Sequence, residues 1–242
     1  PLPPPLLMAG APDGGVSARG PAPTLPLTAL WLCRHGETPW NAEGRLQGQC
    51  EAAPGLTEAG RRQAASLGAA LAGAAPRPAA VFSSDLVRAA ETATIVAMAL
   101  GVADGPVLMP GLRERDLGIL TGLPRARAAA TLPTAYAALA SGAAIEGGGE
   151  SAAGLAARVR VALAAVAEAA GPGACAVVVS HGGTIAAARG LASGRGVKGR
   201  VGNCEGGLIF VSAGGRLTVG PRGLPGVGGG CDADAAGGAG GG

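Results

Sequence analysis

The 242-residue sequence has few aromatic and few charged residues. Charged residues make up 14% of it, and the five aromatic residues are Trp31, Trp40, Phe82, Tyr136 and Phe210. Apolar residues make up 48%, so the chain can bury a substantial core, but it must build that core from small side chains. Small side chains favour helices packed closely on a parallel sheet. The formal net charge of +3 is too small to indicate a nucleic-acid partner.

Cysteine is scarce, and long hydrophobic runs are absent. The five cysteines are odd in number and show no C-x-x-C spacing, which argues against a disulfide framework and against a cysteine zinc site. No apolar run approaches the roughly 20 residues of a membrane span. The Pro-rich start of the chain is a poor secretory signal. We therefore expect no membrane partner and a cytoplasmic location, with an organelle as the alternative.

Glycine and proline gather at the two ends of the chain. Residues 1–27 hold eight of the 19 prolines, and residues 220–242 hold 11 of the 45 glycines. Such composition is typical of disordered segments. We expect a Pro-rich tail at 1–27, one folded domain at 28–219 and a Gly-rich tail at 220–242.

Short apolar runs alternate with amphipathic stretches through this domain. Strands are expected at 28–33, 79–83, 107–109 and 175–179, with a terminal hairpin at 208–211 and 216–219. Helices are expected at 57–71, 84–100, 124–140, 151–170 and after 184. The alternation predicts an α/β fold, a three-layer sandwich with a mostly parallel central sheet and helices on both faces.

The only two histidines of the chain occupy matched settings. His35 follows an apolar run and Arg34, whereas His181 follows an apolar run and Ser180, and a glycine comes after each. The carboxyl ends of strands form the ligand crevice of an open α/β sheet, so both imidazoles are expected there. Two capped core histidines are the alternative. The matched placement, with Arg34 beside one of the pair, favours a functional role.

Two further charged residues follow predicted strands. Arg88 lies early in the helix after the second strand, where its guanidinium can reach the same crevice and match phosphate oxygens. From spacing alone, a surface ion pair with Asp85 or Glu91 is an equal alternative. Glu114 belongs to the charged run 113–116 after the third strand, and without context this run is typical of a solvated loop.

These segments together resemble the histidine phosphatase (phosphoglycerate mutase-like) superfamily. The run Arg34-His35-Gly36-Glu37-Thr38-Pro39-Trp40-Asn41 looks like its signature. Six further elements follow in the family's order: 44–48, 56–60, Ser83-Ser84-Asp85 with Arg88, Glu114 with Gly118, 148–151 and 180–183. The resemblance spans residues 30 to about 212 and implies a phosphoglycerate mutase-like fold and a phosphatase-type member.

The resemblance also implies a role for each matching residue. His35 would be the nucleophile and Glu114 the proton donor, Arg34 and Arg88 would hold the phosphoryl oxygens, and His181 would be the second pocket histidine. Substrate contacts would come from Asn41, Thr38, Gln47 and Gly182. The run 49–56 is longer than the family's usual segment, so its contacts do not transfer. No metal and no cofactor are expected, because cationic clamps supply most of the catalysis of phosphoryl transfer.

His35 must attack with a neutral nitrogen. Arg34 and Arg88 disfavour the imidazolium, and a backbone carbonyl on the other ring nitrogen would fix the tautomer. The expected function is metal-independent hydrolysis of a small phosphorylated metabolite through a phosphohistidine, with the substrate's identity and the oligomeric state left open.

Two alternatives to a phosphatase stay open. A cofactor-dependent phosphoglycerate mutase would use the same pocket, but the roughly 35 residues between Glu114 and the 148–151 element leave little material for a lid that excludes water. A catalytically idle phosphate-binding module is disfavoured, because every catalytic position carries a competent residue.

Overall fold

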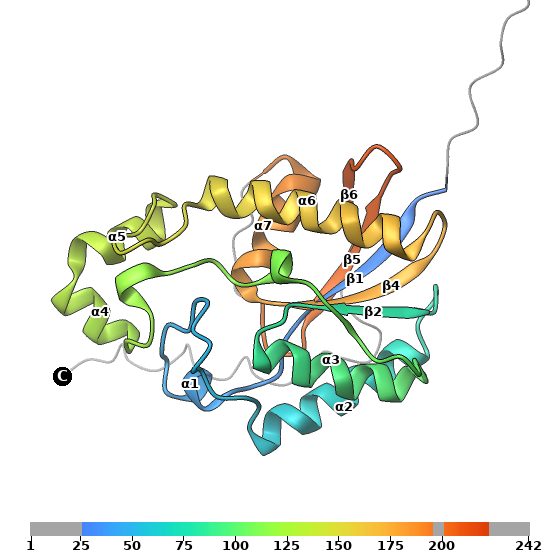
Figure 1. Cartoon of the computed structure of the whole chain (residues 1–242), viewed down its shortest axis with the longest axis horizontal. Helices are drawn as coiled ribbons and strands as arrows, with labels where there is room; N and C mark the ends of the chain where they lie inside the picture. The colour runs from blue at the N-terminus through green and yellow to red at the C-terminus, as the bar shows by residue number, and fades with distance from the viewer. Residues whose placement is uncertain (1–25, 196–200, 223–242) are drawn as a thin grey trace, which may run out of the picture.

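The computed structural model describes residues 26–195 and 201–222 of the chain. Its six strands form one sheet in the order β3-β2-β4-β1-β5-β6 (Figure 1). The strands are β1 (Thr28–Arg34), β2 (Ala80–Ser83), β3 (Val107–Leu108), β4 (Cys175–Ser180), β5 (Gly206–Val211) and β6 (Leu217–Arg222). The pairs β3–β2, β2–β4 and β4–β1 are parallel, whereas β5 pairs antiparallel with both β1 and β6. The expected mostly parallel sheet is confirmed.

Helices α2 (Glu58–Ala72) and α3 (Val87–Leu100) cover one face of this sheet, and α6 (Ala152–Ala170) and α7 (Gly182–Ser193) cover the other. The shorter helices are α1 (Pro39–Ala42), α4 (Arg125–Thr131) and α5 (Pro133–Ser141). Side chains of β1 alternate between the faces: Trp31 packs in the core under α2 and α3, and Leu30 and Leu32 pack in the core under α6 and α7. The result is the three-layer sandwich predicted from the sequence (Figure 1).

Small residues allow the close packing that the composition demands. A Cβ built on Gly68 of α2 would lie 2.6 Å from the Cβ of Ala99 on α3, so any larger residue would force the two helices apart. Leu67 and Leu71 on the same helix are fully buried. Burying one leucine side chain stabilises a fold by roughly 1.5–3 kcal/mol.

The prediction of a single helix at 124–140 is wrong, because the structure has two helices there. α4 ends before Leu132, and Pro133 takes the first position of α5. Proline lacks the N–H that a continuous helix needs and restricts the residue before it, so Leu132 leaves the helical conformation. These two helices pack over a small apolar cluster of their own, formed by Leu46, Leu117, Leu120, Ala128, Ala135 and Ile145.

Two element boundaries differ from the predicted ones by three residues, and one helix was not predicted. α3 begins at Val87 instead of residue 84, because the Ser84 hydroxyl accepts the Leu86 N–H in a turn (3.3 Å) before the helix. The four-residue α1 was not predicted from the sequence. β6 runs to Arg222, three residues beyond the domain boundary expected at 219. Of the two expected tails, residues 1–25 and 223–242 lie outside the described residues.

Two global features concern the described residues only. Within 26–195 and 201–222, no helix is long and apolar enough to cross a membrane. The four cysteines of this part are free thiols: Cys33, Cys175 and Cys204 are buried, and Cys50 is half-buried.

Candidate active site

His35 lies directly after β1, at the carboxyl edge of the parallel strands. Its backbone N–H donates to Ser180 O (3.0 Å), and this bond continues the pairing of β1 with β4. The side chain is only 3% exposed, and Nδ1 lies 2.7 Å from Gly36 O. A carbonyl oxygen only accepts, so Nδ1 carries the proton and Nε2 keeps its lone pair. This is the tautomer that a nucleophilic imidazole requires.

The charge state of His35 follows from its surroundings. Burial lowers the pKa of the imidazole well below its ordinary value, and the Arg88 and Arg34 guanidinium groups lower this pKa further. His35 is therefore neutral at physiological pH, as the sequence predicted.

Two glycines bring the backbone after His35 onto α2. A Cβ on Gly36 would lie 2.6 Å from Gly60 O, and a Cβ on Gly60 would overlap Glu37 O. The Gly36 N–H donates to the Thr92 hydroxyl of α3 (3.0 Å). Thr92, which the sequence did not single out, thus helps to fix the loop that orients the His35 ring.

His181 lies at the end of β4, in the N-cap position of α7. Its ring is completely buried, and its centroid is 5.3 Å from that of His35. Among the described residues, neither ring nitrogen has a hydrogen-bond partner. Burial, followed by the Arg88 charge, lowers the pKa of His181 well below its ordinary value. A neutral imidazole keeps one N–H, so His181 can donate a hydrogen bond to an anion.

Arg88 emerges from the first turn of α3 and is 2% exposed. Its Nη2 donates to Gly48 O (2.8 Å). Burial lowers the pKa of the guanidinium to about 10, so the group stays cationic at neutral pH. A buried cation of this kind is costly unless it faces an anion, which is typical of an anion-binding site.

The alternative of a surface ion pair for Arg88 is wrong. Asp85 pairs with Arg113 (2.7 Å), and Glu91 pairs with Arg61 (2.6 Å). The second arginine, Arg34, is half-buried, and its Nη1 donates to Val201 O (2.9 Å).

Glu114 reaches the same region from the other side. Its Oε1 accepts the Arg115 N–H (2.8 Å), and its Oε2 accepts the Gly183 N–H at the start of α7 (3.0 Å). A Cβ on Gly183 would overlap the carboxylate. The Gly183 N–H of the α7 N-terminus therefore binds Glu114. Gly182, which we expected to contact substrate, does not line the cavity.

Thr38, which we also expected to contact substrate, does not line the cavity. It is fully buried, and its hydroxyl accepts hydrogen bonds from Asn41 N (3.1 Å) and Gln47 Nε2 (2.9 Å). Thr38 therefore caps α1 and positions two residues that do line the cavity. Asn203, which the sequence analysis missed, donates to Asn41 Oδ1 (3.1 Å) and to His35 O (3.0 Å).

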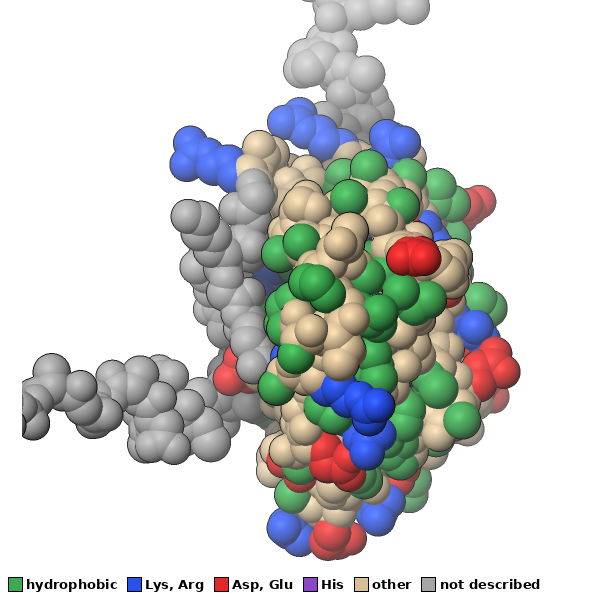
Figure 2. All heavy atoms as spheres, turned by 90° about the vertical axis from the view of Figure 1, so that its left-hand side faces the viewer, with side chains coloured by type: hydrophobic (Ala, Val, Ile, Leu, Met, Phe, Trp, Pro, Cys, Tyr) green, Lys and Arg blue, Asp and Glu red, His purple; other side chains and the backbone are tan. Residues whose placement is uncertain are grey.

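Six of these residues line one cavity of about 820 Å³: Arg34, His35, Asn41, Gln47, Arg88 and Glu114. His181 is not among the lining residues and lies behind His35. Among the residues that the structure describes, the charged side chains that line the cavity are one carboxylate, Glu114, and six arginines: Arg34, Arg45, Arg88, Arg115, Arg125 and Arg195. The remaining wall is largely apolar and comes from α6, α7 and the α4–α5 end of the molecule. Figure 2 looks onto that end and shows hydrophobic side chains with scattered charges. The excess of arginine favours an anionic ligand.

Two neutral histidines, the buried Arg88, the half-buried Arg34 and the Glu114 carboxylate lie together at one edge of an α/β sandwich, an arrangement that favours a phosphate ligand. Within the described residues, no three His, Cys, Asp or Glu side chains converge to hold a metal ion. The chain belongs to the histidine phosphatase superfamily (branch 1), whose family model matches residues 30–204. The resemblance predicted from the sequence motifs is confirmed.

Two plant relatives are similar to the chain. It is 42% identical over 164 residues to the metal-independent phosphoserine phosphatase of Arabidopsis thaliana, across 66% of this chain and 67% of that protein. It is also 42% identical over 158 residues to the phosphoglycerate mutase-like protein 4 of the same plant, across 64% of this chain and 66% of that protein.

Solved structures have the same fold. The mycobacterial glucosyl-3-phosphoglycerate phosphatase complexed with VO3 is 31% identical, with a TM-score of 0.66 over 79% of this chain and 97% of that chain. The YhfR structure from Bacillus stearothermophilus is 29% identical, with a TM-score of 0.69 over 79% of this chain and 95% of that chain.

Proposed function

We propose that the protein hydrolyses phosphomonoesters without a metal, through a phosphoryl group carried on His35. The observation that carries this proposal is the hydrogen bond from His35 Nδ1 to Gly36 O, which leaves a neutral Nε2 lone pair among Arg34, Arg88 and His181. The 42% identity to a metal-independent phosphatase supports the same chemistry.

In the first half-reaction, the arginines hold the phosphoryl oxygens and His35 Nε2 attacks phosphorus. The N–P bond forms while the bond from phosphorus to the leaving oxygen breaks, and Glu114 passes its proton to that oxygen. Negative charge spreads over the equatorial oxygens in the transition state, where Arg34, Arg88 and the His181 N–H stabilise it.

In the second half-reaction, water replaces the alcohol. Glu114, now a carboxylate, takes a proton from the water that attacks the phosphohistidine. The N–P bond breaks, inorganic phosphate leaves, and His35 returns to its neutral form. Each proton that Glu114 donates is thus recovered, and the cycle closes with net consumption of one water.

The substrate class follows from the cavity. A volume of about 820 Å³ holds a body larger than phosphate alone. Arg125 of α4 lies apart from Arg34 and Arg88 and favours a second anionic group such as a carboxylate. Arg45, whose guanidinium also pairs with Glu43, lines the same part of the cavity. A small phosphorylated sugar acid or amino acid has this combination of groups.

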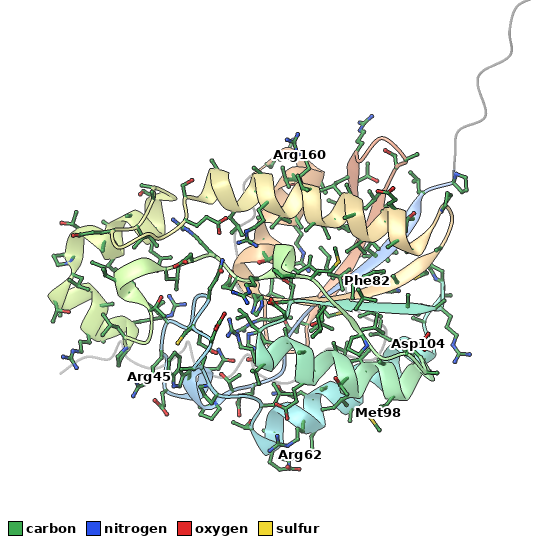
Figure 3. The ribbon with its side chains drawn as sticks, viewed as in Figure 1. Arg45, Arg62, Phe82, Met98, Asp104 and Arg160 are labelled. Carbon is green, nitrogen blue, oxygen red and sulfur yellow. The ribbon has the colours of Figure 1, made fainter. Side chains whose placement is uncertain are left out.

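Trapping the intermediate tests the proposed nucleophile. Protein quenched during turnover of a ³²P-labelled substrate in EDTA should carry label that is acid-labile and base-stable. His35→Ala should carry none, and Arg62→Met, an exposed position on α2 (Figure 3), should label normally. Turnover should be the same in EDTA and in Mg²⁺. Acid-stable label, or label that survives His35→Ala, contradicts the nucleophile, whereas loss of turnover in EDTA contradicts the metal-independent class.

A phosphoglycerate mutase is the second candidate, since a 42% identical relative bears a mutase-like name. A mutase must shield its phosphohistidine from water until the acceptor reacts. Here the short helices α4 and α5 supply little covering material. With 3-phosphoglycerate, with and without 2,3-bisphosphoglycerate, we expect phosphate release to exceed isomer formation. The opposite ratio would favour the mutase.

A further inference from the structure

The segment that carries Glu114 has no strand partner. β3 ends at Leu108, residues 110–112 form a 3₁₀ turn, and residues 113–116 form neither helix nor strand. The backbone carbonyls of this stretch therefore need donors from side chains, because a buried carbonyl without a donor destabilises the fold.

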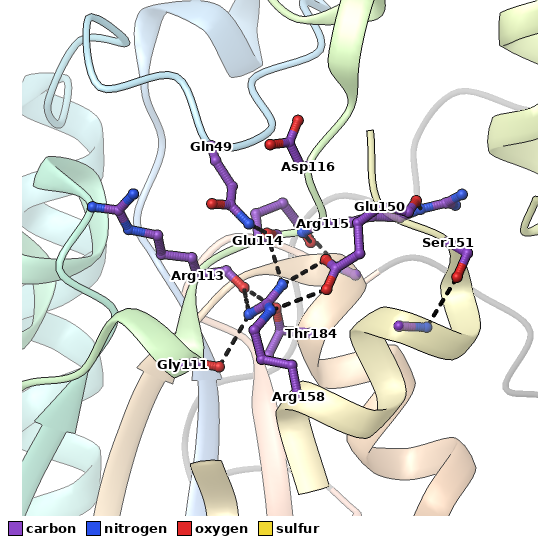
Figure 4. A network of polar contacts seen from close by, with 12 residues as sticks. Gln49, Gly111, Arg113, Glu114, Arg115, Asp116, Glu150, Ser151, Arg158 and Thr184 are labelled. Atoms are coloured by element: carbon purple, nitrogen blue, oxygen red, sulfur yellow. Dashed lines mark hydrogen bonds and ion pairs between the residues drawn. The ribbon is translucent and has the colours of Figure 1, made fainter. Parts of the chain in front are cut away.

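Arg158 of α6 donates to three of four consecutive carbonyls, two of which also accept from the Thr184 hydroxyl (2.9 Å) and from Gln49 Nε2 (2.9 Å). Its Nη1 donates to Gly111 O (3.0 Å) and Arg113 O (2.9 Å), and its Nη2 donates to Glu114 O (3.2 Å) (Figure 4). The fourth carbonyl, that of Leu112, accepts from the serine hydroxyl at the end of β4 (2.8 Å). Only a planar guanidinium presents several N–H groups in one fixed fork, so lysine cannot replace this contact set.

Glu150 fixes the guanidinium in turn. Its carboxylate accepts from Arg158 Nε (3.1 Å) and Nη2 (2.7 Å). The backbone of Glu150 is tied to the same segment, since its N–H donates to Asp116 O (3.0 Å) and its carbonyl accepts from Arg115 Nε (2.8 Å). Arg158 thereby anchors the residues before and at Glu114 to α6, and the Glu150 backbone anchors the residues after it (Figure 4).

The orientation of the Glu114 carboxylate depends on this anchor. The carboxylate accepts two backbone N–H groups, from Arg115 and Gly183. These two bonds set its direction only while the Glu114 backbone stays in place. Neither Arg158 nor Glu150 lines the cavity, so their hydrogen bonds reach the reaction through the segment that carries Glu114. The Arg158 charge also lowers the pKa of His181, but this effect does not depend on the leaving group.

We propose that Arg158, oriented by Glu150, is a positioning residue that holds Glu114 where it exchanges its proton with the leaving oxygen. The inference rests on the proposed function, because it assigns Arg158 to the proton-transfer step of that hydrolysis. It predicts a defect that grows as the leaving group becomes poorer. A purely structural role would slow all substrates alike.

The test compares an alkyl phosphate with p-nitrophenyl phosphate in Arg158→Met, which removes the donors and keeps most of the side-chain length. We expect kcat/KM, which reports only the first half-reaction, to fall by about 10²-fold for the alkyl phosphate, the typical cost of a misplaced catalytic group. For the aryl phosphate, whose good leaving group needs little protonation, kcat/KM should fall by less than about threefold. Arg160→Met, exposed on the outer side of α6 (Figure 3), is the matched control and should behave as the unmodified protein.

A double variant separates positioning from other roles. Glu114→Gln with Arg158→Met should be no slower than Glu114→Gln alone, because the two substitutions remove the same step. If Arg158→Met does not fold, Arg158→Lys gives the same comparison with a smaller loss. Equal losses on both phosphates, or multiplied losses in the double variant, overturn the positioning role and leave the phosphatase intact. Absence of turnover in the unmodified protein overturns both.

Discussion

The two sides of the active site are held in different ways. His35 and His181 follow β1 and β4, adjacent parallel strands whose backbone hydrogen bonds run up to the catalytic residues. Glu114 lies in an irregular segment whose carbonyls are bound by side chains from α6, α7 and β4 and by Gln49. The proposed nucleophile thus depends on regular secondary structure, and the proposed proton donor depends on a network of side-chain contacts.

This difference means that the two half-sites can be perturbed separately. Strand pairing is a property of the core and is lost only when the fold is lost. Single side-chain substitutions around Glu114 leave the sheet unchanged, so they should alter proton transfer before they alter phosphate binding. The following predictions test this separation, from the largest effect to the smallest.

Glu114→Gln should have the largest effect, confined to poor leaving groups. A general acid contributes ~10²–10⁴-fold, so kcat/KM for an alkyl phosphate, which reports the first half-reaction, should fall by that amount, and kcat/KM for p-nitrophenyl phosphate much less. Steady-state kinetics on the two substrates measures the contrast. Equal losses would make Glu114 a binding or structural residue. Phosphohistidine trapped from the aryl substrate should persist in this variant, because His35 is untouched.

Gly183→Ala should have the next largest effect. Its Cβ would overlap the Glu114 carboxylate, whereas a Cβ on the neighbouring Gly182 would lie 3.9 Å from Arg34 Nε, an ordinary contact. A displacement of about 1 Å in a catalytic group costs up to ~10²-fold. We expect Gly183→Ala to approach that loss on alkyl phosphates, and Gly182→Ala to lose several-fold less. Similar losses in the two variants would show that Gly183 does not act through Glu114.

The two buried histidines should make the free energy of unfolding decrease at mildly acidic pH. The pKa of His35 and that of His181 are both lowered in the fold, mainly by burial. Below the unfolded pKa of about 6.5 the unfolded chain binds protons that the folded chain does not, so stability falls as the pH falls. The loss between pH 7.5 and 5.5 is roughly 1.4 kcal/mol per histidine.

Urea unfolding at several pH values measures this loss. His181→Asn should remove the contribution of this histidine, so the slope of the free energy of unfolding against pH should fall by about half. An unchanged slope in His181→Asn would mean that this ring is not buried in its neutral form. The window avoids Asp85, whose pKa is lowered chiefly by its hydrogen bonds with Arg113, and which loses its contribution only at lower pH.

The positions of His35 and His181 at strand ends were predictable from the sequence. The position of Glu114 was only partly predictable. Apolar runs before His35 and His181 marked two buried strands, and parallel strands bring their carboxyl ends together whatever lies between them. Glu114 was recognised through the family motif, because its irregular surroundings have no periodic pattern.

Arg158 was missed for a physical reason. It lies in an Ala-rich amphipathic helix, where an arginine usually faces solvent. Its contacts are with backbone carbonyls remote in sequence, and no local spacing encodes them. The signal that was available is the eight-residue step from Glu150 to Arg158 across the Ser151 cap of α6. Thr38 was misplaced for the same kind of reason, since its capping of α1 appears only once that short helix is known.

The buried thiols determine how the protein can be labelled with reporter groups. Burial raises the pKa of Cys175 to about 11 and that of Cys204 to about 12, and it raises the pKa of Cys33 further, so these three stay protonated and closed to thiol reagents. Cys50 is the half-buried thiol of the described part of the chain, two residues from the Gly48 carbonyl that binds Arg88. A maleimide fluorophore on Cys50 would therefore place an optical reporter beside the phosphate site, where its emission should change when the cavity fills.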